Sequence, residues 1–234
     1  MSKKNSILDY LPQDFPKDKY KNIHDRVLQY KDKFPLQYKQ FTGGYMSLMY
    51  RYLACIKHSN DYIKFIEKDR SSPSYFLRYE QERELFNFFT NGLSAIETYG
   101  YMIYMICSIN KPNDFKVITK DLWKIKLKDK SKECTVEKLK TFYPEENITQ
   151  EIEKLINSDE YQVWVKVRNI LMHRGTPGRI IMASTRRPKI ERSDLWFEGI
   201  EINKKTTDCR LKWLGSNLFN LIELTDDFTT NKLI

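Results

Sequence analysis

The stretch SDEYQVWVKVRNILMHRGTPG, residues 158–178, has the features of one short helix with a defined beginning and end. Ser158 is a favoured N-cap residue, and the two acidic residues after it suit the partial positive charge of a helix N-terminus. Gly175 and Pro177 are typical of the residues that follow a helix C-terminus. We therefore predict a helix over about residues 159–173.

The apolar residues of this predicted helix recur at steps of three and four, so they share one face. We expect that face to pack on the protein core and the polar residues to fall beside it. The apolar face consists of Val163, Trp164, Val167, Ile170 and Leu171.

Three polar residues near the end of the predicted helix are suited to phosphodiester chemistry. Arg168 carries a permanent charge on a planar fork of donors, and His173 can both take and give a proton near neutral pH. Asn169 and His173 are four residues apart and share a face, so Asn169 can hold one imidazole nitrogen and fix the tautomer. A structural role is the alternative, because a helix dipole also favours positive side chains in the last turn.

Arg168, Asn169 and His173, in the sequence RNILMH, resemble the R-x4-6-H signature of the HEPN superfamily, including the polar residue that often follows the arginine. The resemblance implies an all-α bundle, a homodimer and, in many members, a metal-independent ribonuclease that serves as a toxin or defence protein. An antitoxin protein is a further partner that it implies. In a subset of these toxins an antitoxin modifies a tyrosine two residues after the histidine, and Gly175 stands there in this chain. That mode of neutralisation is therefore not expected.

The resemblance also implies a mechanism. The 2′-hydroxyl of single-stranded RNA attacks the adjacent phosphorus, with His173 as general base or acid, Arg168 stabilising charge in the transition state and Asn169 orienting His173. The RNA supplies the nucleophile, so the reaction needs no metal ion and no cofactor, and DNA is not a substrate. The alternative is a non-catalytic helical module that binds nucleotide, nucleic acid or a protein partner.

A second pair satisfies the same loose spacing. Arg51 and His58, in MYRYLACIKHSND, have six residues between them and lie in the middle of a predicted helix. We favour Arg168 and His173, because RNILMH has the polar second residue, stands at a helix end and precedes a basic loop. For Arg51 and His58 a polar contact between helices is the preferred interpretation.

The longest predicted helix covers about residues 74–109 and should be the central one. A polar stripe with Glu97 at its middle runs along it, and the apolar part around Glu97 is too short and too interrupted to span a membrane. Carboxylates are rarely buried without a partner, so we expect Glu97 to meet Arg168 and to orient it without itself reacting. The alternative is that Glu97 faces water. The stripe consists of Asn87, Thr90, Ser94, Glu97, Tyr101, Tyr104 and Ser108.

The remaining elements complete a mainly all-α, up-and-down bundle of HEPN type in a single domain, residues 1–234. Residues 1–17 should form an extended lead-in. Two β-like runs, residues 179–183 and 195–202, predict a small hairpin-like insert before the last helix. Further helices are predicted over about residues 18–33, 36–68, 135–142, 150–157 and 208–228.

Two basic segments are candidates for contact with phosphate. Residues 116–132 carry seven lysines, and apolar residues alternate with lysine from Trp123 onward, which favours a short half-buried strand, although a helix is also compatible. A solvated surface is the simpler interpretation of these lysines. The second segment surrounds the predicted hairpin and gathers positive charge near His173. Its predicted RNA-binding residues are Arg174, Arg179, Arg186, Arg187 and Lys189.

Composition bounds the class of protein. Hydrophobic residues at 41% and aromatic residues at 14% exclude a disordered chain. The net charge of +9 favours an acidic partner, which can be RNA, DNA or anionic lipid. The N-terminus lacks the apolar run of a signal peptide. We predict a cytoplasmic protein without a membrane partner, because scattered cysteines fit a reducing compartment. The cysteines have no spacing typical of a zinc site, so no metal site is predicted. They are Cys55, Cys107, Cys134 and Cys209.

Overall fold

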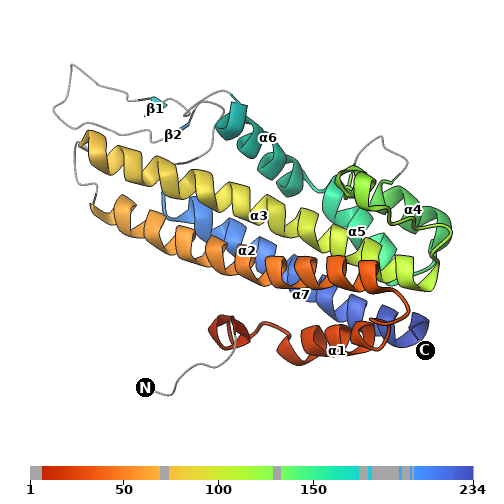
Figure 1. The fold of residues 1–234 in the computed structure, drawn as a ribbon. Coiled ribbons are helices and arrows are strands. Elements are labelled where there is room, and N and C mark those ends of the chain that lie inside the picture. The colour runs from red at the N-terminus through yellow and green to blue at the C-terminus, as the bar shows by residue number, and fades with distance from the viewer. Residues whose placement is uncertain are drawn as a thin grey trace, which may run out of the picture.

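The computed structural model is an all-α helical bundle (Figure 1). It describes residues 7–68, 74–128, 133–173, 179–180, 195–196, 201 and 203–233. The α-helices are α1 (Lys17–Leu28), α2 (Pro35–Lys68), α3 (Tyr75–Asn110), α4 (Thr135–Phe142), α5 (Asn147–Asn157), α6 (Asp159–His173) and α7 (Lys205–Lys232). The 3-10 helices η1 (Ile7–Tyr10) and η2 (Thr119–Lys124) and the strands β1 (Arg179–Ile180) and β2 (Leu195–Trp196) complete the described part.

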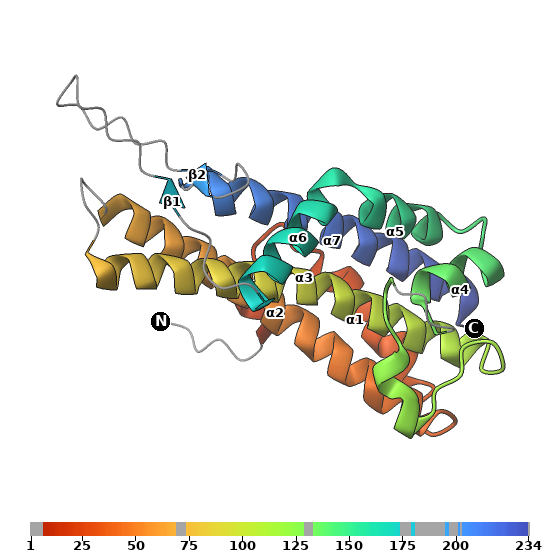
Figure 2. The same cartoon turned by 90° about the horizontal axis from the view of Figure 1, so that it is seen from above.

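Helices α2 and α3 form a long antiparallel hairpin, and α7 runs alongside both (Figure 1). Helix α1 packs on α7, and α6 lies across α3 (Figure 2). Helix α3 is therefore the central helix that its length and apolar pattern predict, and residues 102–109 are all buried. Within the described ranges, no helix combines the length and the apolar character that a membrane crossing requires.

Two glycines on α3 let other segments approach its backbone closely. A Cβ atom added at Gly92 would lie 2.2 Å from the Trp164 ring of α6, and one added at Gly100 would lie 2.6 Å from Leu127 Cδ1. Only a glycine leaves room for such contacts. Gly92 thus allows α6 to pack on α3, and Gly100 allows the 125–128 segment to do so. Glu97 lies between these two glycines in the sequence.

Trp164 fixes α6 on the bundle. Its side chain is fully buried, and the centroid of its ring lies 5.0 Å from that of Phe88 and 4.9 Å from that of Phe89, both on α3. Trp213 of α7 stacks on Trp164 at 6.3 Å. Aromatic packing of this kind adds to the stabilisation from burial, so it holds α6 on α3.

A buried carboxylate ties α1 to α7. The side chain of Asp226 is 4% exposed, forms an ion pair with Arg26 and lies 2.9 Å from Lys19 Nζ. Burial by itself would raise the pKa of Asp226, but the hydrogen bonds from Arg26 and Lys19 outweigh it and hold the pKa below its ordinary value.

The predicted helices are present, with differences at their ends. The helices expected over residues 135–142 and 159–173 have those bounds as α4 and α6. The helix expected over residues 18–33 stops at Leu28 as α1. Gly43 and Gly44 do not break α2, which continues from Pro35 to Lys68, and Gly44 is buried beside Met102 of α3.

The N-terminal segment is not the plain extended lead-in that its sequence predicts. It contains η1, and both Leu11 and Phe15 are buried. The Phe15 ring packs edge-on against Tyr20 and Phe219, at centroid distances of 5.5 and 5.4 Å. Two isolated apolar residues anchor this segment, and two residues give no periodic signal in a sequence.

The lysine-rich segment forms η2 up to Lys124, and beyond it the short strand that its alternation favours is reduced to one isolated parallel β-bridge between Lys126 and Cys134. The alternation itself is present, because Ile125 and Leu127 are buried while Lys126 and Lys128 are exposed. Further along, β1 and β2 pair antiparallel. The link between them lies outside the described residues, so the hairpin-like insert stays a prediction.

Candidate functional site

Arg168 of α6 faces Glu97 of α3. The Arg168 Nη2 atom lies 3.4 Å from Glu97 Oε1, which confirms the predicted pairing of these two side chains. The pair is not buried as the sequence suggested, since the side chains of Arg168 and Glu97 are 30% and 48% exposed. Solvent therefore reaches both charges, and the ion pair contributes little to stability.

The Arg168 guanidinium retains unused hydrogen-bonding capacity. Its Nε atom is buried and has no hydrogen-bond partner among the described residues. A guanidinium carries five N–H donors, and the contact with Glu97 is long for a charge-assisted hydrogen bond. The Arg168 side chain as a whole is 30% exposed, so its solvent-facing donors can serve an incoming anion.

The pair lies in a cleft of about 410 Å³, within the usual range for ligand sites. Three segments far apart in the sequence meet there, namely α3, α6 and residues 123–128. Three positive side chains face one carboxylate, so the cleft favours anions. Its lining residues are Glu97, Trp123, Ile125, Lys126, Leu127, Lys128, Tyr161 and Arg168.

Tyr161 brings an aromatic hydroxyl to the cleft wall. Burial raises the pKa of Tyr161 to about 12, the negative charge of Glu97 adds to the rise, and Arg168 opposes it. The phenol is therefore neutral at physiological pH and can donate a hydrogen bond. Tyr161 lies seven residues before Arg168, two helical turns away on the same face of α6.

His173 is the last residue of α6. It lies five residues beyond Arg168, which corresponds to about 7.5 Å of helical rise and about 140° of rotation. Asn169 is exposed and Met172 is 47% exposed, so solvent reaches this end of the helix. The His173 side chain lies outside the described structure, and its contact with Asn169 stays a prediction.

The predicted RNA-binding residues also lie largely outside the described structure. Arg179 begins β1, but its side chain is not described. The other predicted contacts fall in ranges that the structure does not describe, namely Arg174, Arg186, Arg187 and Lys189.

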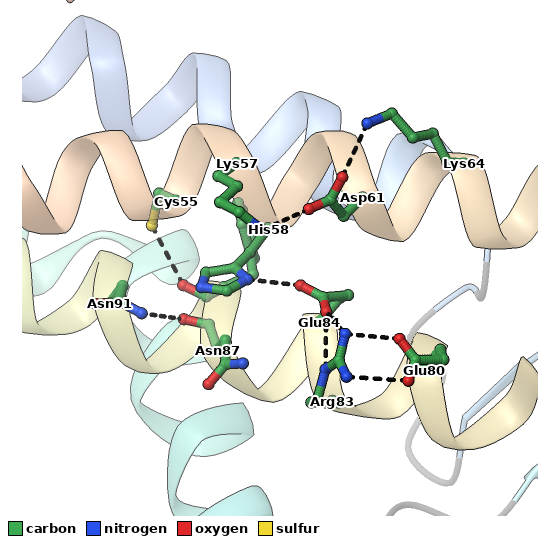
Figure 3. Close-up of polar contacts among 11 residues, drawn as sticks. Cys55, Lys57, His58, Asp61, Lys64, Glu80, Arg83, Glu84, Asn87 and Asn91 are labelled. Atoms are coloured by element: carbon green, nitrogen blue, oxygen red, sulfur yellow. Dashed lines mark hydrogen bonds and ion pairs between the residues drawn. The ribbon is translucent and has the colours of Figure 1, made fainter. Parts of the chain in front are cut away.

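His58, the histidine of the second sequence match, pairs with a carboxylate of the neighbouring helix. His58 Nδ1 lies 2.6 Å from Glu84 Oε2 and links α2 to α3 (Figure 3). Glu84 also accepts from Arg83, which is paired with Glu80. Burial by itself would raise the pKa of Glu84, but His58 and Arg83 outweigh it and lower the pKa. His58 thus makes the polar contact between helices that we preferred for it.

Six of the eight residues that line the cleft were not among the predicted site residues, and four of these six bear groups that can contact a ligand. They contribute an exposed indole, two lysines and a phenol to the cleft around Arg168. The alternation of the 123–128 segment could have indicated the two lysines, and the seven-residue step on α6 could have indicated the phenol. The same alternation groups Trp123 with the buried Ile125 and Leu127, so no sequence signal indicated the exposed indole. The four are Trp123, Lys126, Lys128 and Tyr161.

Among the described residues, no group of three or more His, Cys, Asp or Glu side chains is arranged to hold a metal ion.

Comparisons with protein-family models, with curated proteins and with solved structures find no match.

Proposed function

We propose that this protein is a metal-independent endoribonuclease of HEPN type that cleaves single-stranded RNA beside α6. The observation that carries the proposal is Arg168, a fixed guanidinium with spare donors in a positively charged cleft. His173 follows on the same helix, at the spacing of the R-x4-6-H signature. The lysines and the neutral phenol of Tyr161 suit the same polyanionic ligand.

Each residue has a defined role in the proposed reaction. His173 takes the proton of the ribose 2′-hydroxyl, whose oxygen attacks the adjacent phosphorus, and the bond to the 5′-oxygen breaks. Arg168 stabilises the negative charge that develops on the phosphoryl oxygens, and Glu97 holds Arg168 in place. Asn169 orients His173. The products are a 2′,3′-cyclic phosphate and a 5′-hydroxyl that has gained a proton.

A second copy of the chain completes the proposed site. One histidine cannot be base and acid in the same step, and a homodimer that brings two His173 residues to one groove supplies both. The basic residues from Arg174 to Lys189 would then hold the RNA strand on either side. Scattering and a His173 cross-link between chains test this arrangement, and a monomer that cleaves RNA would exclude it.

The decisive experiment incubates the purified protein with single-stranded RNA in EDTA. Wild type should release fragments with 2′,3′-cyclic phosphate ends, whereas His173→Ala and Arg168→Ala should not, and the DNA of the same sequence should stay intact. His58→Ala is the matched control, because it removes a histidine from the other sequence match. Equal survival of the RNA with wild type and His173→Ala refutes the nuclease proposal. Cleavage lost in His58→Ala alone would show that the other pair is catalytic.

A non-catalytic binding module is the second candidate, and the size of the cleft favours it. A volume of about 410 Å³ accommodates one nucleotide, with Arg168 as the ligand of its phosphate. Wild type and His173→Ala would then bind RNA equally and cleave none, while Arg168→Ala would bind more weakly. A toxin or defence role in the cytoplasm, with an antitoxin as partner, belongs to the nuclease proposal alone.

A further inference from the structure

Trp123 is a large aromatic side chain that the fold leaves in water. It is 71% exposed, although a buried aromatic of this size contributes about 1.5–3 kcal/mol. The indole forms part of the wall of the Arg168 cleft. An exposed tryptophan beside a cationic cleft suits a ligand that has both a flat apolar face and negative charge.

The segment that carries Trp123 is held firmly. Leu127 packs against the α3 backbone at Gly100, and Ile125 is also buried. The backbone N–H of Thr135 donates to the Lys126 carbonyl at 2.8 Å, so α4 anchors the segment from the other side. The indole is thus carried next to an anchored backbone, which lowers the entropic cost of binding to it.

The charges around the indole are placed outward by the same packing. Because Ile125 and Leu127 point inward, Lys126 and Lys128 are exposed on the side of the cleft. The Lys124 ammonium lies 5.5 Å from the centroid of the Trp123 ring. Lys124 is also paired with Asp121 at 2.8 Å, so the cations of the cleft that the indole shares are Lys126, Lys128 and Arg168.

We propose that Trp123 stacks a nucleobase of single-stranded RNA while Lys126 and Lys128 contact the adjoining phosphates. The inference rests on the proposed function, because it assumes that RNA is the ligand of the Arg168 cleft. Stacking on an aromatic ring combined with a basic groove is the general mode of single-strand recognition, and it tolerates every base. The platform leads the strand to Arg168 and excludes duplex RNA, whose bases are already stacked.

Binding to the His173→Ala protein in EDTA tests the platform without cutting the probe. Fluorescence anisotropy of a labelled oligouridine of about eight nucleotides gives the affinity. Trp123→Ala should weaken binding about 5- to 150-fold, the loss expected for one stacked base, and Trp123→Phe should recover most of it. Replacing both Lys126 and Lys128 by alanine should lower the salt slope by about 1.4.

The matched control is Phe76→Ala, which removes an aromatic side chain of similar exposure, 72%, from the far end of α3. Its affinity should equal that of the parent, and thermal unfolding should show that every variant is folded. Equal affinity of Trp123→Ala and Phe76→Ala overturns the inference, as does a parent protein that binds no RNA. A Trp123→Ala loss in a protein that never cleaves RNA would keep the platform and refute only the nuclease.

Discussion

Gly92→Ala should destabilise the protein, whereas Gly43→Ala should stabilise it, although both replace a glycine inside a long helix. Alanine is favoured over glycine in a helix interior by about 1 kcal/mol, so helix propensity alone predicts a gain at both positions. A Cβ atom at Gly43 of α2 meets nothing within 4 Å, and there the gain should be realised.

At Gly92 the new Cβ atom has no room. It would lie 2.2 Å from Trp164 Cζ3 and 2.4 Å from Cη2, with Cys55 Sγ 3.2 Å away. The Trp164 ring must move by more than 1 Å to restore an ordinary contact of about 3.4 Å, and it is enclosed by Phe88 and Phe89. Overpacking costs about 3 kcal/mol at the upper end of its usual range, which leaves a net loss of about 2 kcal/mol.

Urea unfolding and thermal melting measure both variants. We expect Gly92→Ala to melt about 4–8 °C below wild type, because each kcal/mol shifts a chain of this size by about 2–4 °C. The melting temperature of Gly43→Ala should be slightly above that of wild type. Since Trp164 seats the helix that carries Arg168, Gly92→Ala should also reduce RNA binding. A Gly92→Ala protein as stable as Gly43→Ala would show that Trp164 does not lie against α3 in this way.

Three further substitutions test the ion pairs. Asp226→Ala should lower the free energy of unfolding by about 1.5–3 kcal/mol at neutral pH, because it removes the charged acceptor of the hydrogen bonds from Arg26 and Lys19. The pKa of Asp226 is lowered in the folded protein, so wild type has this contribution above the ordinary pKa of an aspartate and loses it as pH falls through the folded pKa. The free energies of unfolding of the two proteins should therefore converge in acid. Glu97→Ala should change stability by less than about 1 kcal/mol while slowing RNA cleavage, and an unchanged rate would show that Glu97 does not hold Arg168. His58→Ala should cost about 1–3 kcal/mol by removing a partner from a buried carboxylate, yet leave cleavage by the folded fraction intact, as denaturation and a single-turnover assay can establish.

The starts of α3 and α6 were predictable because the responsible residues are local in the sequence. Ser158 caps α6 by accepting from the Tyr161 backbone N–H at 3.3 Å, as its identity and position suggested. Ser74 does the same for α3 at 3.2 Å from the Leu77 N–H. Each cap involves residues within a stretch of four, so it can be predicted without knowing the tertiary structure.

The cleft was only half predictable, because it depends on which segments become neighbours. The polar stripe on α3 made Glu97 the natural partner of Arg168, and the two side chains do meet. Nothing in the periodicity of the 123–128 segment indicates that it lies beside α6, and its alternation favoured a full strand where the structure has the end of η2 and a single β-bridge at Lys126. The approach depends on Leu127 and the missing side chain at Gly100, a pair separated by 27 positions in the sequence.

Arg26 and Arg168 differ in how far their guanidinium groups are engaged by the protein itself. Arg26 forms its ion pair with Asp226, and its Nη1 also donates to Thr229 Oγ1 at 3.2 Å and to the Asp226 carbonyl at 3.3 Å. Its carboxylate is buried, so this guanidinium is committed to holding helices together. Arg168 has a single long contact with a half-exposed carboxylate and a buried Nε without a partner in the described structure. Because such a pair contributes at most about 1 kcal/mol, stability is a weak reason for an arginine at that point, and the RNA ligand that we propose would use the donors that have no partner among the described residues.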